Sequence, residues 1–363
     1  MKLLIQQHHY DNEIAGVLTY IYSLIPELEV KGIEVKSLST KQDFFRKWLN
    51  YIVWLEIVHM NSNHLVFAIL CKILGKKIII KYHYTFYQSA HTNYQKMSFK
   101  ERIKLELSQS LPKANYPLKW KLYTAIKWLR LATRLMTATL ADSHTACSNF
   151  LAESCAFTTL VETLYNPIKI INNNFHTSSK VISQPYQFVF VGRLDPCKGV
   201  DILLKATQIL QAENQDFRVL IIGDGTEASQ LTRLTSDLKI TNCVSFLGKL
   251  SHQEVLAIVQ DALALVVPSR WQEPAGYVVL EASSVETCSI VSKMGGLPEI
   301  AGPHSLFFKN EDAAELASSM RYCLNYPDEA IHRGFQSNQY VGETFSPART
   351  VNQLLDICRK LYP

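Results

Sequence analysis

Short apolar runs alternate with helical patterns along this chain of 363 residues, and the alternation occurs twice. In the first half, the runs KLLIQQH, IEVKSLS, EIVHMNS and KIIIKYH are separated by segments whose apolar residues recur at helical spacing. In the second half, FVFVGRL, FRVLIIG, VSFLG, LALVVPS, SIVSK and SLFFK are separated in the same way. Such alternation predicts parallel βαβ units. The sequence therefore predicts an α/β protein made of two doubly wound, Rossmann-like domains.

A polar, asparagine-rich segment at 168–187 separates the two series of strands. Clusters of Asn, Ser and Pro between periodic segments indicate a connecting region. We therefore place an N-terminal domain at 1–170 and a C-terminal domain at 185–345. The length of the chain is sufficient for two domains that each have their own core.

Positive charge is concentrated in the first half of the chain. Residues 1–180 contain 22 Lys and Arg against 12 Asp and Glu, a balance of +10, whereas the whole chain has a net charge of +5. A helical insert at about 96–139 alone carries ten cations and two acids, interleaved with tryptophan, tyrosine and leucine. A basic helix with aromatic residues is typical of membrane-surface binding, and we expect an anionic membrane as partner. The alternative is a solvated helix face. No nucleic-acid-binding signature accompanies the charge.

The eight cysteines are scattered without a CxxC pair, so the sequence contains neither a zinc knuckle nor a redox motif. The start, MKLLIQQHHYDNE, becomes polar after three apolar residues and predicts a first strand. We find no run of about 18 uncharged apolar residues of the kind that spans a bilayer. We therefore expect a cytoplasmic protein that is peripheral at the inner face of the cell membrane.

Two glutamates, Glu273 and Glu281, enclose the run EPAGYVVLE, where the strand pattern LALVVPS gives way to a helical pattern. Ligands of open α/β sheets bind outside the carboxyl ends of strands, where loop amides and helix N-termini face an anion. Carboxylates at such a place suit hydroxyl-rich groups, so we expect one to bind a sugar and the other a neighbouring ribose. The alternative is that Glu281 is a solvated helix residue and Glu273 an acid that complements the helix dipole.

The segment VFVGRLDPCKGVDILLKA carries two cations in a loop that follows a strand. The strand ends at Gly192, Arg193 and Lys198 follow in the loop, and Gly199 opens an amphipathic helix. Arginine offers a planar fork and lysine a point charge, which together suit a diphosphate leaving group at a helix N-terminus. The alternative is a pair of solvated loop cations.

The segment GDGTEA satisfies the G-x-G-x-x-A pattern of dinucleotide-binding loops. However, the strand before it is the second of its domain, and no strand-end acid lies about 20 residues further on, as that pattern requires. We therefore interpret Gly223 and Gly225 as part of a loop that lets the backbone approach a nucleotide base or ribose. A dinucleotide oxidoreductase is the less favoured alternative.

Taken together, these motifs resemble those of family 4 of the retaining glycosyltransferases, which have the GT-B architecture. GRLDPCKG, GDG, VSFLGKLSHQEV, PSRWQEPAGYVVLEA and GGLPEI occur in order over roughly 188–302. AGVLTYI, IVHMNSNH, IIIKYHYTF and ADSHTACSNFLAE in the first half are similar more loosely. The resemblance implies two domains that face one another across a cleft, with a C-terminal helix at 346–363 that crosses back to the N-terminal domain.

The resemblance also implies roles for the matching residues. Arg193 and Lys198 would hold the donor diphosphate. Glu281 would bind the ribose hydroxyls, and Glu273 the transferred sugar. The expected catalytic residues are Arg193, Lys198, Glu273 and His83, and the expected donor-binding residues are Gly16, Gly192, Gly223, Gly225, Gly276, Tyr277 and Glu281.

The remaining roles concern backbone groups and one histidine. The backbone amides of Gly276 and Tyr277 would help at the sugar and the phosphate. His83 would line the donor sugar pocket, and Gly16 would let the first loop approach the phosphate closely. Two protein cations would neutralise the diphosphate, so no metal or other cofactor is expected.

The chain departs from the family pattern at three places. Ala15 replaces a second loop glycine, and Ala275 replaces an aromatic residue after Glu-Pro. After the second glutamate of the pattern, the chain has Glu286, Thr287 and Cys288 where the family has a tight turn of small residues. This last departure puts the detailed shape of the donor pocket in doubt.

Other enzymes that use paired carboxylates fit less well. A retaining hydrolase needs two carboxyl groups about 5 Å apart. Eight residues largely along a helix place Glu273 and Glu281 roughly 12 Å apart. Two histidine clusters lie at strand ends without a supporting set of acids, which favours core or loop histidines over a metal site. They are His8 with His9, and His59 with His64. A sugar-nucleotide epimerase would need an acid and a base around the sugar, and the sequence shows no such set.

The sequence therefore predicts a retaining glycosyltransferase that moves a sugar from a nucleoside diphosphate-sugar to a hydroxyl acceptor. The basic N-terminal domain indicates a lipid-linked or cell-surface saccharide as acceptor, as in lipopolysaccharide, other polysaccharide or glycolipid assembly. The alternative is a catalytically degenerate protein that binds a sugar nucleotide without transferring the sugar.

Overall fold

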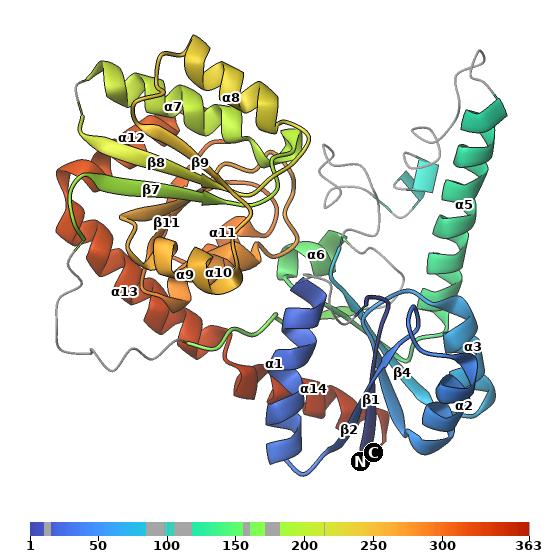
Figure 1. Cartoon of the computed structure of the whole chain (residues 1–363). Helices are drawn as coiled ribbons and strands as arrows, with labels where there is room; N and C mark the ends of the chain where they lie inside the picture. Colours follow the sequence, from blue (N-terminus) through green and yellow to red (C-terminus); the bar gives the residue numbers. More distant parts are fainter. Residues whose placement is uncertain are drawn as a thin grey trace. The chain divides into compact units, whose positions relative to one another are not determined.

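The computed structural model describes residues 1–10, 16–84, 98, 100, 101, 103, 104, 118–154, 160–170, 182–213 and 215–362, and for 118–125 and 127 the main chain alone. The chain divides into two compact units (Figure 1). The N-terminal unit comprises Met1–Pro167 and Pro347–Pro363, and the C-terminal unit comprises Ile168–Ser346. Much of the predicted insert at 96–139 lies outside the described residues, whereas its second part forms helix α5, Leu118–Thr139.

A parallel six-stranded sheet in the order β2-β1-β3-β4-β5-β6 forms the centre of the N-terminal unit. Its strands are β1 (Lys2–Gln7), β2 (Glu34–Ser39), β3 (Ile57–Met60), β4 (Lys77–Tyr82), β5 (Ser143–Ala146) and β6 (Val161–Thr163). Its helices besides α5 are α1 (Gly16–Val30), α2 (Phe45–Trp54), α3 (Leu65–Ile73), α6 (Asn149–Ser154) and α14 (Pro347–Leu361).

The last helix of the chain completes the core of the N-terminal unit. Val351 and Leu354 of α14 join one buried cluster with Leu3 of β1 and Leu24 of α1. Lys360 Nζ also lies 3.1 Å from a carboxylate oxygen of Glu162 in β6. The helix therefore belongs to the N-terminal unit although it follows the C-terminal unit in sequence.

A second parallel six-stranded sheet, in the order β12-β11-β10-β7-β8-β9, forms the centre of the C-terminal unit. Its strands are β7 (Tyr186–Val191), β8 (Phe217–Ile222), β9 (Val244–Gly248), β10 (Ala264–Val267), β11 (Cys288–Ser292) and β12 (Leu306–Phe308). Its helices are α7 (Val200–Ala212), α8 (Ala228–Asp237), α9 (His252–Gln260), α10 (Tyr277–Ser284), α11 (Leu297–Ala301), α12 (Ala313–Asn325) and α13 (Pro327–Thr344), and Pro196–Lys198 forms the 3₁₀ turn η2.

Alternate residues of the central strands face opposite sides of this sheet, so the unit has two apolar layers. Phe188 and Phe190 of β7 pack in a cluster that includes Leu203 of α7. Val189, which lies between them, packs in a different cluster that includes Val279 of α10. Both faces of the sheet are therefore covered by helices, as the predicted doubly wound arrangement requires (Figure 1).

In each sheet there is one place where the strand order reverses, because later strands are added on the other side of the first strand. In the C-terminal unit this switch point lies between β7 and β10, and in the N-terminal unit it lies between β1 and β3. Loops that leave two such strands on opposite sides open a crevice at the carboxyl edge of the sheet, which is where ligands of doubly wound folds bind. The candidate residues of the C-terminal unit follow β7 and β10.

Candidate functional site

Two loops meet at the switch point of the C-terminal sheet. The first, 192–199, follows β7, and the second, 268–276, follows β10. The backbone amides of Arg270 and Trp271 both donate to the carbonyl of Cys197, over 2.9 and 3.1 Å. Ser269 Oγ donates to the same carbonyl over 3.2 Å. These hydrogen bonds hold the two loops together although they lie far apart in the sequence, and their side chains share one site.

Lys198 and Glu273, one from each loop, form a direct ion pair. Lys198 Nζ lies 2.5 Å from Glu273 Oε1, and the two side chains are only 20% and 9% exposed. The same carboxylate oxygen accepts from Ser269 Oγ over 3.0 Å. The Lys198 ammonium also lies 5.4 Å from the centre of the Trp271 ring, within cation–π range. The predicted phosphate-binding and sugar-binding side chains are thus immediate neighbours.

Glu273 is fixed from the backbone side as well. Its carbonyl accepts from the amide of Gly296 over 2.7 Å, so the turn after β11 packs against the second loop. GGLPEI, which the sequence placed near the ligand, therefore supports this loop and opens the short helix α11 at Leu297.

Arg193 does not share the Lys198 pair. Its guanidinium lies 2.8 Å from Asp195 Oδ2 within the same loop, and its side chain is 71% exposed. Asp195 also accepts from Thr226 Oγ1 over 3.2 Å. Arg193 and Lys198 thus lie in one loop with different environments, and Arg193 has an exposed guanidinium at the edge of the site.

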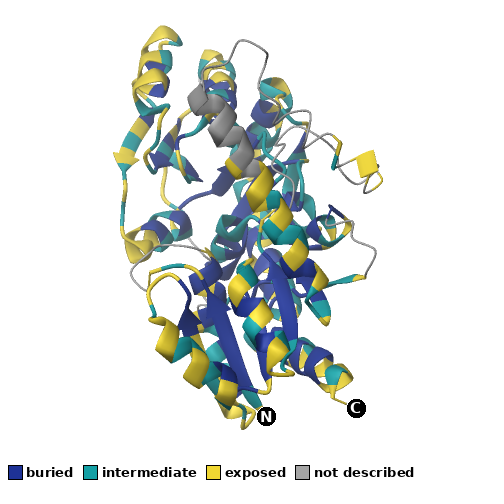
Figure 2. Cartoon of the chain, turned by 90° about the vertical axis from the view of Figure 1, so that its right-hand side faces the viewer, coloured by how far each residue is buried: buried dark blue, intermediate teal, exposed yellow. Residues whose placement is uncertain are grey.

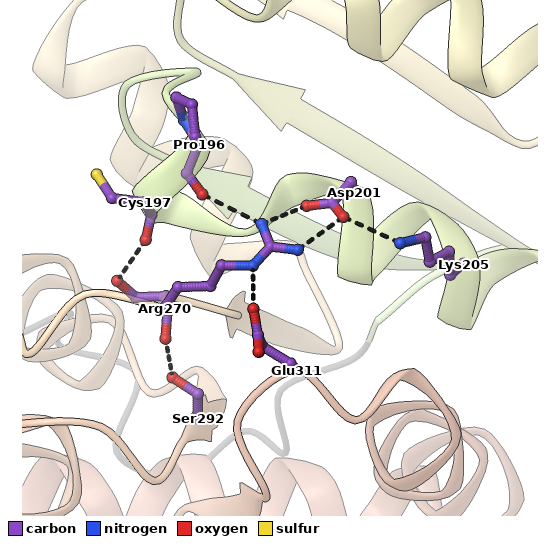
Figure 3. Close-up of polar contacts among 8 residues, drawn as sticks. Pro196, Cys197, Asp201, Lys205, Arg270, Ser292 and Glu311 are labelled. Atoms are coloured by element: carbon purple, nitrogen blue, oxygen red, sulfur yellow. Dashed lines mark hydrogen bonds and ion pairs between the residues drawn. The ribbon is translucent and has the colours of Figure 1, made fainter. Parts of the chain in front are cut away.

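Arg270 connects the two loops through its side chain and is a residue that the sequence did not single out (Figure 3). Its two terminal nitrogens donate to the two carboxylate oxygens of Asp201 over 2.6 and 2.8 Å. Its Nε donates to Glu311 over 2.8 Å, and it also reaches the carbonyl of Pro196 over 3.1 Å. Hydrogen bonding to Asp201 raises the pKa of Arg270. The bidentate pair therefore holds the second loop against the start of α7.

The glycines of GDGTEA have a packing role within the protein. A Cβ on Gly223 would lie 1.8 Å from the carbonyl oxygen of Gly192, and one on Gly225 would lie 2.5 Å from that of Leu194. The amide of Leu194 also donates to the carbonyl of Asp224 over 3.0 Å. The loop after β8 thus packs against the loop after β7, and close approach of two backbones explains both glycines.

Helix α10 begins at the site and carries the second predicted glutamate. Gly276 is its N-cap, in left-handed conformation, and Tyr277 is its first residue. Glu281 follows in the second turn, and burial raises the pKa of its carboxyl group to about 7. His252 Nδ1 lies 3.7 Å from Glu281 Oε1. The Glu281 side chain is 22% exposed, so it is not the solvated helix residue of the alternative interpretation.

The departure at Glu286, Thr287 and Cys288 lies away from these loops. It joins the C-terminal end of α10 to the start of β11, whereas the candidate residues follow the carboxyl ends of strands. Glu286 has a φ of 59°, and Thr287 Oγ1 donates to the carbonyl of Val259 over 2.8 Å. The altered turn is therefore built into the opposite edge of the sheet, one helix length from Glu273.

His83 and Gly16 lie in the N-terminal unit. Gly16 is exposed and is the first residue of α1. His83 follows β4, and its Nε2 lies 2.9 Å from Asn61 Oδ1. Because an amide oxygen only accepts, Nε2 carries the hydrogen and Nδ1 is left as an acceptor. Burial, and then the neighbouring Lys81, hold the pKa of His83 well below its usual value, so the ring is neutral.

Lys81 is an unforeseen buried cation beside this histidine. Its Nζ donates to the carbonyl of Leu164 over 2.5 Å and lies 3.7 Å from the centre of the Tyr20 ring. Burial holds its pKa well below the usual value.

Among the described residues, no group of three or more His, Cys, Asp and Glu side chains is placed to hold a metal ion.

The structure thus brings together Gly192, Lys198, Glu273 and Gly276 at one switch point, with Arg193 at its edge. It also shows two partners that sequence reasoning missed, Arg270 and Asp201, which lie 69 positions apart in the chain. The sequence held no local signal for this pair, because contact between the loop after β10 and the start of α7 depends on the order of the strands in the sheet.

Part of the chain is similar in sequence to known glycosyltransferases. Residues 172–337 match the model of the family described as glycosyl transferases group 1. The chain is 32% identical over 163 residues to glycogen synthase of Mycobacterium tuberculosis, covering 44% of this chain and 39% of that protein. It is 32% identical over 176 residues to D-inositol 3-phosphate glycosyltransferase of Corynebacterium aurimucosum, covering 46% and 41% of the two chains. The match spans about two fifths of the length of these relatives.

Solved structures extend the likeness in fold to nearly the whole chain. Anabaena HepE in complex with UDP superposes with a TM-score of 0.69 at 16% identity, covering 99% of this chain and 100% of that chain. Sucrose-phosphate synthase from Thermosynechococcus elongatus gives a TM-score of 0.69 at 17% identity, covering 99% of both chains. The fold class is therefore GT-B, as predicted. The match to the glycosyl transferases group 1 model lies within the C-terminal unit.

Proposed function

We propose that this protein is a retaining glycosyltransferase of family 4, which transfers a sugar from a nucleoside diphosphate-sugar to a hydroxyl group. The observation that carries the proposal is the Lys198–Glu273 pair at the switch point of a unit that matches the group 1 family model. A cation for the diphosphate and a carboxylate for sugar hydroxyls lie side by side there. The 32% identity with proteins named glycogen synthase and D-inositol 3-phosphate glycosyltransferase supports the same class of reaction.

The costly event in this reaction is departure of the diphosphate from an oxocarbenium-like carbon. Lys198 and Arg193 would stabilise the charge that develops on the leaving oxygen, together with the amides of the loops at Gly192 and Gly276. Preorganised electrostatic groups of this kind commonly contribute most to catalysis. Because the Arg270 and Asp201 contacts hold the loops in place, the cation does not have to be brought into position during the reaction.

The hydroxyl groups of the donor would be bound by carboxylates and a neutral histidine. Glu273 would accept from the transferred sugar, and Glu281 from the ribose, with the Tyr277 amide near the phosphate. His83 offers a neutral Nδ1 as acceptor to a sugar hydroxyl, and Gly16 would let the loop before α1 approach the phosphate. Because no residue of the described set is assigned as a covalent nucleophile, we propose that the leaving phosphate takes the proton of the acceptor. The two cations would neutralise the diphosphate without a metal.

The acceptor is proposed to be a lipid-linked or cell-surface saccharide at the inner face of the cell membrane. The excess of ten positive charges in residues 1–180 supports an anionic membrane as partner of the N-terminal unit. Among the described residues, none of the helices combines the length and apolar character that a membrane span requires. We propose that the attachment is peripheral.

A thermal-shift panel of UDP, GDP and ADP, followed by the sugar donors of the nucleotide that binds, tests the donor assignment. The nucleoside diphosphate that raises the melting temperature is then offered as labelled donor sugars, and release of the diphosphate is measured with and without saccharide acceptors. Turnover supports the enzyme. A protein that binds the nucleotide but neither hydrolyses nor transfers the sugar is the degenerate binder, and a protein that binds none of the three contradicts both.

A further inference from the structure

Helices α2 and α3 of the N-terminal unit expose a large number of apolar side chains. Of the 22 large hydrophobic residues that are exposed within the described part of the chain, eight lie between residues 44 and 74, and three lie in the whole C-terminal unit. The eight are Phe44, Phe45, Leu49, Val53, Val66, Ile69, Ile73 and Leu74. We call the surface that they form the α2–α3 face. Isolated exposed apolar residues are normal, but a concentration of this kind indicates an interaction site.

The spacing of these residues places them on one side of each helix. Phe45, Leu49 and Val53 of α2 follow one another at intervals of four, and their exposed fractions are 53%, 37% and 69%. The other side of α2 carries Ile52, which is fully buried. Side chains four apart lie above one another on a helix, so α2 has two apolar sides. One is covered by the protein, and the other faces outward.

Helix α3 repeats the arrangement beside it. Val66, Ile69 and Ile73 follow at intervals of three and four and are 55%, 39% and 73% exposed, whereas Phe67 and Cys71 are fully buried. The two helices pack against each other, and α3 also packs against α5. Helices α2 and α3 lie at the right of Figure 1, and Figure 2 turns that side toward the viewer. Exposed residues are visible there along the helices. The outward sides of α2 and α3 are therefore parts of one surface.

Cations outnumber acids in the segment that carries this apolar surface. Residues 41–77 contain six Lys and Arg against two Asp and Glu. Asp43 is paired with Lys47, 2.6 Å away, and Lys72 with Asp142, 2.5 Å away. Arg46 is exposed in the first turn of α2, next to Phe45. Lys36 Nζ lies 4.2 Å from the centre of the Trp54 ring, so a tryptophan at the end of α2 is also held beside a cation.

We propose that the α2–α3 face docks on an anionic lipid bilayer, with the two helices lying in the plane of the interface. Helices of this kind bury their apolar side at the boundary of headgroups and acyl chains, while flanking lysine and arginine attract anionic lipids. The excess of cations around the face argues against a second copy of the chain as its occupant, because two such faces would bring like charges together. The inference deepens the proposed function by naming the surface that holds the protein at its acceptor.

The position of the face fits a lipid-linked acceptor. Phe44 and Phe45 lie at the N-terminal end of α2, and Val66 at that of α3, where β2 and β3 have ended. Asn61 and His83 follow the carboxyl ends of β3 and β4 in the same parallel sheet. The apolar helix starts and the histidine assigned to the sugar are therefore at the same edge of the N-terminal unit. An acceptor held at a membrane surface by its lipid would be presented at this edge.

Vesicle sedimentation tests the inference with the full chain. Vesicles of phosphatidylcholine alone are compared with vesicles that contain about 30% phosphatidylglycerol, at ionic strengths of about 0.05 and 0.5 M. We expect binding to the anionic vesicles that weakens with salt. Leu49→Asp and Ile73→Asp should each lower the vesicle affinity by about tenfold or more. Arg46→Glu should shift the salt dependence toward weaker binding.

Matched controls separate the face from general effects of charge. Val30→Asp introduces the same charge at an apolar residue of α1 that is 80% exposed, and Arg218→Glu makes the same reversal at an exposed residue of the C-terminal unit. Both should bind vesicles like the parent protein. Hydrogen exchange with and without anionic vesicles should show protection at 44–54 and 66–74. Protection restricted to 96–139, or no binding to anionic vesicles, would overturn the inference.

Two further measurements complete the test. If analytical ultracentrifugation shows a dimer that Leu49→Asp dissociates, the occupant of the face is a second copy, and the lipid assignment is wrong. Nucleotide binding by the C-terminal unit is measured separately by thermal shift, and the α2–α3 variants should leave it unchanged. Loss of vesicle binding with intact nucleotide binding, or the reverse, therefore distinguishes failure of this inference from failure of the proposed transferase activity.

Discussion

Lys198 and Glu273 come from loops 75 positions apart in sequence, yet their charged atoms lie 2.5 Å apart in a largely buried pair. A pair of this kind neutralises itself while no ligand is bound. Under the proposed function, a bound donor would share both partners, with its diphosphate beside the ammonium and a hydroxyl beside the carboxylate. We therefore expect a folded donor, whose sugar lies back over its diphosphate, because it would satisfy both groups at once.

Lys198→Ala should reduce turnover by a factor on the order of 100 or more, because it removes the preorganised positive charge that is proposed to stabilise the leaving diphosphate. Steady-state release of nucleoside diphosphate measures this effect. Lys309→Ala is the control, since Lys309 is an exposed lysine of the same unit, and this variant should keep the parent rate. Normal turnover by Lys198→Ala would show that the cation is not placed at the diphosphate.

Glu273→Gln should weaken discrimination between donor sugars more than binding of the nucleoside diphosphate alone. The amide still fills the space, but it lacks the negative charge that accepts hydrogen bonds from hydroxyl groups and pairs with Lys198. Affinities for the diphosphate and for the complete donor are compared by calorimetry. Glu213→Gln, which disrupts a surface pair with Arg321, should change neither affinity. Equal losses for both ligands would contradict the role given to Glu273.

Arg270→Lys should lower kcat by a factor on the order of ten to 100, because a displaced loop misplaces the reacting groups and lysine cannot form the bidentate pair. We also expect a loss of about 2 kcal/mol in the free energy of unfolding. Arg321→Ala removes an exposed bidentate pair with Glu213 in the same unit and should cost about 1 kcal/mol or less. A kcat unchanged in Arg270→Lys would restrict Arg270 to a role in stability.

Binding of a nucleoside diphosphate should strengthen as the pH rises through about 7. Burial raises the pKa of Glu281 to about 7, and ribose hydroxyls donate to the ionised form, so binding releases a proton below this pH. Calorimetry in buffers of different ionisation enthalpy measures the release. Glu281→Gln should abolish it, and His252→Gln should retain it, which separates the carboxyl group from its neighbour.

The same carboxyl group makes the unliganded protein less stable at high pH. Its pKa in the folded protein is raised above the ordinary value of 4.5. The folded state therefore binds the proton more tightly than the unfolded chain, and stability is lost as the pH rises from about 4.5 to about 7. Denaturant unfolding of Glu281→Gln should show a shallower loss over this range than the parent protein.

Gly223→Ala should destabilise the C-terminal unit by more than about 2 kcal/mol, because its Cβ would meet the backbone oxygen of Gly192. Gly248→Ala is a matched control. Gly248 also has a positive φ, of 69°, but an added Cβ there would have no atom within 4 Å. It should cost only about 1 kcal/mol. If denaturant unfolding showed equal losses in the free energy of unfolding for the two variants, glycine would be required at position 223 only for its backbone conformation.

The sequence predicted the strand and helix series well because both depend on local periodicity, and it placed Lys198 and Glu273 in the loops that carry them. It did not predict that the two side chains pair, because contact between loops depends on strand order, which periodicity does not determine. The same reason hid Arg270 and Asp201. The charge in the N-terminal unit was assigned to the insert at 96–139, whereas the exposed apolar surface described above belongs to α2 and α3.

The interpretation of two glycines also needed the structure. Gly223 and Gly225 fit a nucleotide-binding loop by spacing, but their neighbours are the backbone atoms of Gly192 and Leu194. The departure at Glu286 looked close to the ligand because it follows Glu281 by five positions. A helix of eight residues carries the chain about 12 Å away from the start of α10.

The return of α14 to the N-terminal unit determines the order in which the chain can fold as it is synthesised. Val351 and Leu354 contribute to the cluster that contains Leu3, so the core around β1 is completed only after α14 has been synthesised. The whole C-terminal unit has left the ribosome before that happens. Removal of α14, or a bulky group attached to it, should therefore damage the unit that contains β1 more than the C-terminal unit that precedes α14 in the sequence.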